Sequence, residues 1–146
     1  MPPTDLPLEE ERRIWLEGVH LFNEGQFFEA HDAWEEIWRQ VRHPQRERFY
    51  RAIIQAAVTL ELLRRGRAVG VRQVFVSCQE LFEGLPEIYM GIRIPSLIEQ
   101  LRAAILPTLE DLETRHIRID PSRLFAIELL YDPFEHSPHG EGADGL

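Results

Sequence analysis

The chain has 146 residues, of which 44% are hydrophobic and 28% are charged. This composition is typical of one globular domain, and it argues against a multidomain assembly, a fibre or a wholly disordered chain. The net charge of −9 argues against a general nucleic-acid binder, which is normally basic, and against attraction to anionic membrane surfaces.

The compartment is indicated by what the sequence lacks. Cys78 is the single cysteine, so no internal disulfide suggests an oxidising compartment. The N-terminal segment has no apolar core of signal-peptide length, and no uninterrupted apolar run approaches the roughly 18 residues of a membrane helix. We therefore expect a soluble cytoplasmic protein with no membrane partner.

Apolar spacing predicts five or six helices and no strand. Pro107 falls inside the fifth helical pattern and should kink or split it. Asp120 and Pro121 form a cap-plus-first-turn signature for a short last helix. The expected helices span about 7–23, 27–41, 44–65, 68–82, 95–112 and 122–131. We thus expect an all-α domain over residues 1–131, folded as a single compact bundle, and a disordered tail over residues 132–146.

The third expected helix is apolar on nearly every side between Ala52 and Leu63. A helix of this kind lies at the centre of a protein. Its few polar members are Gln55, Thr59 and Glu61.

The second expected helix carries the residues that bear on chemistry. His31, Glu35 and Trp38 are spaced i, i+4 and i+7, which places them within about 60° of one another on one stripe of the helix. Trp34 lies beside this stripe. A titratable pair on an inward-facing stripe needs partners, because burying it unpaired is costly.

Two interpretations of the pair remain open. In the structural one, His31 and Glu35 hydrogen-bond to each other and to Gln55 of the next helix, and act as a clamp. In the functional one, the pair opens into a pocket lined by Trp34, Trp38 and Gln55. There, an imidazole and a carboxylate one turn apart would bind a divalent metal ion or a small polar ligand.

A catalytic role for the pair would assign different tasks to its members. His31 would exchange protons, and Glu35 would orient it or hold the cation. A catalytic zinc usually has three protein ligands, and the candidates for a third are Glu61, Asp32 or a residue from another helix. The sequence does not decide whether the domain is an enzyme, and it identifies no reaction or substrate.

The motif H-x-x-x-E-x-x-[WY] at residues 31–38 resembles the signature of a family called domain of unknown function 309. The next helix is similar to that family's G-L-I-Q segment, here AIIQ at residues 52–55. The approach to the motif is also similar, with Phe22, Asn23 and Gly25 followed by Glu29 and Ala30. The resemblance covers about residues 12–82. It implies a compact helical bundle and metal binding by the His and Glu, without an established activity.

A non-catalytic interaction module is the alternative function. The His31–Glu35–Gln55 clamp would then be structural, and apolar surface around Tyr89, Met90 and the last helix would bind a protein partner or a second copy of the chain. Arginines gather at residues 39–51 and 64–72. Because acids such as Glu35, Glu36 and Glu47 lie near the first group, we expect a solvated, salt-bridged surface there.

Overall fold

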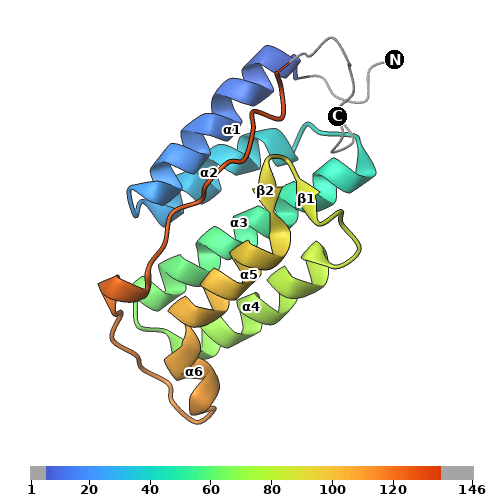
Figure 1. The fold of residues 1–146 in the computed structure, drawn as a ribbon. Helices are drawn as coiled ribbons and strands as arrows, with labels where there is room; N and C mark the ends of the chain where they lie inside the picture. The colour runs from blue at the N-terminus through green and yellow to red at the C-terminus, as the bar shows by residue number, and fades with distance from the viewer. Residues whose placement is uncertain (1–5, 136–146) are drawn as a thin grey trace.

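The computed structural model of the protein describes residues 6–135 (Figure 1). Within this range the chain forms a helical bundle with one small hairpin, which confirms the all-α prediction. The elements are α1 (Leu8–Asn23), α2 (Phe27–Trp38), α3 (Pro44–Arg64), α4 (Ala68–Phe82), β1 (Ile88–Tyr89), β2 (Ile92–Arg93), α5 (Ile94–Ala104), α6 (Leu106–Glu110) and the 3₁₀ helix η1 (Pro121–Arg123). As Pro107 predicts, the fifth helical segment is split, into α5 and α6.

Helix α3 is the centre of the bundle. Both α2 and α4 pack against it, and α1 packs against α2. Pro44 occupies its first turn, where a missing N–H is harmless, and Nδ1 of His43 accepts a hydrogen bond from the Arg46 backbone N–H at 3.1 Å. Gly66 follows its end with φ +77°, a backbone conformation that favours glycine.

Cys78 lies in the core between α3 and α4. Its Sγ is 3.4 Å from the carbonyl oxygen of Ala52, and burial raises the pKa of the thiol to about 12. The thiol is therefore buried and uncharged in the core.

The packing of α1 on α2 depends on a glycine. A Cβ atom on Gly18 would lie 2.0 Å from Nε1 of Trp34, so only a residue without a side chain lets the indole lie across α1. The indole N–H donates to the carbonyl of Trp15 at 3.3 Å, and the Trp15 and Trp34 rings are 5.4 Å apart. Trp34 is thus fully buried and fixes the rotation of α2 about its axis.

A buried ionic group joins α1 to α3. Oε2 of Glu11 accepts from Nε of Arg46 at 3.1 Å and from the Tyr50 hydroxyl at 2.7 Å. Burial and the neighbouring Glu11 carboxylate raise the pKa of Tyr50 well above its usual value, so Tyr50 stays a neutral donor. Arg46 had been expected on a solvated surface; it is instead 4% exposed, because the fully buried Glu11 carboxylate needs a counter-charge.

The connector between α4 and α5 contains strands that the sequence did not predict. Ile88 pairs with Arg93, and Tyr89 pairs with Ile92 in an antiparallel hairpin. Its two turn residues, Met90 and Gly91, both have positive φ, as a tight hairpin turn requires.

The hairpin also corrects the expected interaction surface. Tyr89 and Met90 are both fully buried, since the turn places them against the core, and the Tyr89 ring lies 5.5 Å from that of Phe49. Tyr89 and Met90 themselves are therefore not part of an exposed apolar surface, whereas Ile88, Leu130 and Tyr131 are exposed.

The helix predicted over residues 122–131 is also wrong. Asp120 and Pro121 begin only the short η1, and the chain then runs extended. In this segment the partly or fully buried Phe125, Ile127 and Leu129 alternate with more exposed residues, a period of two that suits an extended chain rather than a helix.

This extended segment, residues 124–135, is a strap across the bundle (Figure 1). The Asn23 side chain binds the backbone of Ile127 twice, donating to its carbonyl at 3.1 Å and accepting from its N–H at 2.7 Å. The Leu130 N–H donates to the carbonyl of Gly91 at 2.7 Å, and Asp132 pairs with Arg12 at 2.7 Å. Backbone groups of the strap that a helix would pair internally are thus paired with groups of the bundle instead. The remainder of the expected tail, residues 136–146, lies outside the described residues.

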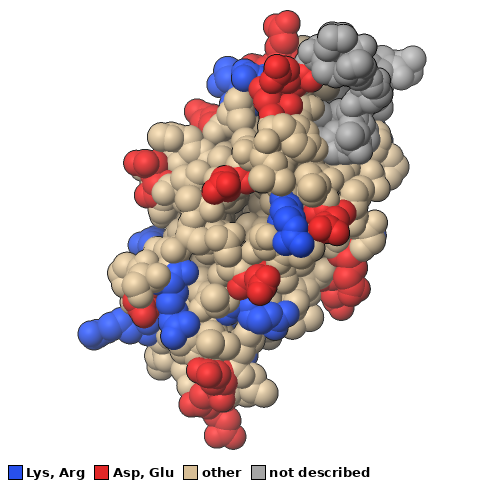
Figure 2. All heavy atoms as spheres, in the orientation of Figure 1, with Lys and Arg blue, Asp and Glu red and all other residues tan. Residues whose placement is uncertain are grey.

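Arginines and acids are interspersed over much of the face shown in Figure 2, and several basic side chains gather at its lower left. The expected surface pairs include Arg39 with Glu35 at 3.4 Å and Arg51 with Glu47 at 3.9 Å. Arg48 differs, since it donates to the backbone carbonyls of Glu80 and Leu81 near the end of α4. No helix within residues 6–135 is long and apolar enough to cross a membrane.

We expect Gly18→Ala to lower the free energy of unfolding by about 1–3 kcal/mol, because the new methyl group would overlap the Trp34 indole. Urea unfolding followed by tryptophan fluorescence measures this loss. Glu17→Ala, at an exposed neighbouring position, is the matched control and should change stability little. A Gly18→Ala protein as stable as the parent would contradict the packing of α1 on α2 described above.

We expect Arg46→Met to destabilise the fold by about 3–5 kcal/mol, since it leaves the Glu11 carboxylate buried without its counter-charge. The double variant Glu11→Gln/Arg46→Met should regain a large part of that loss. Equal stability of the single and double variants in urea would show that no buried charge is being compensated.

Candidate functional site

The rotation of α2 decides where the motif residues lie. With Trp34 fully buried against α1, His31 and Glu35 fall at the edge of the α2–α3 contact, and their side chains are 21% and 26% exposed. Nε2 of His31 lies 3.3 Å from Oε2 of Glu35. The pair is therefore neither sealed in the core nor fully solvated.

Asp32 completes a group of three potential ligands. One atom from each of His31, Asp32 and Glu35 lies within 4.8 Å of the other two. Asp32 is exposed, and Glu35 also faces Arg39 at 3.4 Å. All three side chains come from one and a half turns of α2, so a single rigid element positions them.

Beside this group lies a pocket of about 270 Å³ between α2 and α3. Phe27, Phe28 and His31 line it from α2, and Val58, Glu61, Leu62 and Arg65 line it from α3. The rings of Phe28 and His31 are 5.6 Å apart. We call this the α2–α3 pocket. Apolar walls with a few polar groups are typical of small-ligand sites.

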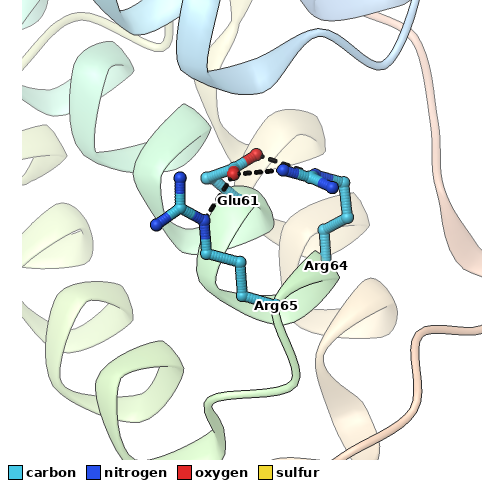
Figure 3. Close-up of polar contacts among 3 residues, drawn as sticks. All are labelled: Glu61, Arg64 and Arg65. Carbon is cyan, nitrogen blue, oxygen red and sulfur yellow. Dashed lines mark hydrogen bonds and ion pairs between the residues drawn. The ribbon is translucent and has the colours of Figure 1, made fainter.

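Glu61 forms an ionic triad with two arginines at the end of α3 (Figure 3). Its carboxylate accepts from Arg64 at 3.0 and 2.5 Å and from Nε of Arg65 at 2.7 Å. The Arg64 hydrogen bonds hold the pKa of Glu61 below its usual value, with burial opposing and Arg65 assisting. Glu61 was a candidate third metal ligand, but its oxygens are already engaged by guanidinium groups.

The other residues expected in the site occupy different surroundings. Trp38 donates from Nε1 to Oε2 of Glu47 at 2.5 Å, which ties the end of α2 to the start of α3. Oε1 of Gln55 and Nδ1 of His31 are both buried and have no hydrogen-bond partner within residues 6–135. Trp34, Trp38 and Gln55 do not belong to the residues that line the α2–α3 pocket.

Several pocket residues were not singled out from the sequence as site residues. Phe28 is half-exposed although its neighbour Phe27 is buried, and Arg65 was counted only as surface charge. One signal was available: Phe28, His31 and Glu35 continue one helical stripe at spacings of three and four. The side of α3 that faces this stripe could not be read from its uniformly apolar pattern.

We expect Glu61→Gln to lower stability by about 1 kcal/mol at neutral pH, because charged hydrogen bonds to two half-exposed arginines are lost. The pKa of Glu61 is lowered in the folded state, so its contribution is present above the unfolded pKa and disappears as pH falls through the folded value. Urea unfolding from pH 7 to pH 2 should therefore show the two proteins converging in acid. Glu36→Gln, exposed on α2, is the control, and a pH-independent difference would refute this account.

Comparison with known proteins places this site in a family context. Residues 15–74, which run from α1 into α4, match the model of a family described as "Domain of unknown function (DUF309)". An uncharacterized protein of Aquifex aeolicus (strain VF5) is 28% identical over 89 residues, which are 61% of this chain and 27% of that relative. The matched part thus spans about a quarter of the relative's length. The resemblance recognised from the H-x-x-x-E-x-x-[WY] motif is confirmed, because residues 15–74 match the model of this same family.

Proposed function

We propose that α2 carries a divalent-cation site formed by His31 and Glu35, with Asp32 as the third ligand. The observation that carries this proposal is the 3.3 Å separation of His31 Nε2 and Glu35 Oε2. Two ligands bonded to one zinc ion at about 2.1 Å and a tetrahedral angle are about 3.4 Å apart. The two atoms already have the spacing that a shared cation needs.

Further support comes from the donor set and its setting. An imidazole with carboxylates is a donor combination that zinc and related metals accept. Asp32 is exposed, and one of its carboxylate oxygens already lies within 4.8 Å of a ligand atom of His31 and of Glu35. Because these three residues leave a coordination position open, the bound cation would be reachable by water or by a small ligand.

The clamp interpretation has less support. A clamp requires a hydrogen bond between Gln55 and the pair, yet Gln55 Oε1 and His31 Nδ1 both lack partners within residues 6–135. The link that does join α2 to α3 is Trp38 to Glu47, which leaves His31 and Glu35 available for a ligand.

The test is metal binding by the full chain, purified without a tag and stripped with a chelator. We expect one equivalent of Zn²⁺ by calorimetry, and a Co²⁺ absorption spectrum with nitrogen and oxygen ligands. His31→Ala and Glu35→Gln should abolish both signals, while His116→Ala, at an exposed histidine far along the chain, should retain them.

The tail histidines provide a second control, since the double variant His136→Ala/His139→Ala should bind as the parent does. Equal metal content in the parent and His31→Ala proteins would exclude this site. Loss of helical circular dichroism in His31→Ala, with no metal bound by the parent, would instead establish the clamp.

A further inference from the structure

We propose that the α2–α3 pocket binds a small organic carboxylate, with its apolar body between Phe28 and Leu62 and its carboxylate on Arg65. This binding needs no metal ion and goes beyond the cation site on α2. It rests on the lining of the pocket, its charge balance and its size.

The walls determine the body of the ligand. Four of the seven lining residues are apolar, namely Phe27, Phe28, Val58 and Leu62. Phe28 is half-exposed, so its ring is accessible to a ligand that enters the pocket. The volume of about 270 Å³ lies just below the usual range of drug-sized sites, so the ligand is small.

The charges determine its polar end. Glu61 carries one negative charge, and Arg64 and Arg65 carry two positive charges; Glu29 also acts electrostatically on Arg64, so its negative charge offsets one of the two positive charges. The Glu61 oxygens are already bound by these arginines, so Glu61 has little capacity to accept from a ligand cation. The pocket therefore favours an anion over an amine.

Arg65 has hydrogen-bond donors that are not used by Glu61. Only its Nε binds Glu61, and Figure 3 shows its two terminal nitrogens directed away from that carboxylate. Paired terminal nitrogens on a planar guanidinium match the two oxygens of a carboxylate. Arg64 differs, because its Nε and one of its two terminal nitrogens are both bound to Glu61 and it does not line the pocket.

His31 provides the opposite wall. The acids near its other ring nitrogen do not cancel the attraction for an anion, since Glu35 is paired with Arg39 and Asp32 is exposed to solvent. Its Nδ1 is buried and has no hydrogen-bond partner in the described part of the chain, so we assign this nitrogen no contact with the ligand.

The experiment uses hexanoate as the probe, with hexanol and hexylamine as matched compounds, titrated into the metal-free full chain and followed by NMR chemical shifts. We expect saturable hexanoate binding in the millimolar range, with weaker binding of hexanol and none of hexylamine. Arg65→Gln should weaken hexanoate binding by about tenfold or more, as expected for a lost charged hydrogen bond.

Arg64→Gln is the matched control, because it removes an equal charge from the same triad but no residue that lines the pocket. Its loss of hexanoate affinity should therefore be clearly smaller than that of Arg65→Gln. Val58→Phe should block binding by filling the pocket. Asp32→Asn should abolish the Zn²⁺ signal and leave hexanoate binding intact, which separates the two proposals. Equal losses in Arg64→Gln and Arg65→Gln, binding of hexylamine, or no saturable binding would overturn the carboxylate site.

Discussion

The contact between Trp34 and Gly18 is the constraint on which the rest of the bundle depends. The Trp34 indole occupies the space that a side chain at position 18 of α1 would fill. It therefore brings α1 and α2 into close contact and allows only one rotation of α2 about its own axis. That rotation leaves His31, one turn earlier, and Glu35, one residue later, at the margin of the α2–α3 contact. The edge position of the titratable pair is therefore a consequence of core packing.

The Glu11–Arg46–Tyr50 group acts at the other end of the same layer. It bonds α1 to the first turns of α3, while Trp38 and Glu47 bond the end of α2 to that same region. A buried ion pair adds little net stability, but removing one member is strongly unfavourable, so such a pair penalises alternative packings. We infer that it keeps α3 in one register, and hence keeps Val58 and Arg65 opposite Phe28 and His31.

The sequence predicted most of the helical framework because its signals are local. Gly25, Gly66 and Gly84 follow the ends of three helices and all have positive φ. Pro44 begins a helix and Pro107 splits one, each at its own position in the chain. The strap and the buried Arg46 depend on partners distant along the chain: Asn23 for the strap, Glu11 for Arg46. The stripe of His31 and Glu35 was readable from spacing alone, whereas the pocket required knowing which face of α3 meets α2.

The state of Cys78 has a practical consequence for studying this protein. A thiol with a pKa of about 12 inside the core is almost entirely protonated near neutral pH, and alkylating reagents attack the thiolate. Because it is the single cysteine of the chain, the folded molecule offers such reagents no competing group. A fluorophore or spin label attached through Phe28→Cys would therefore report from the rim of the α2–α3 pocket without removal of the natural thiol.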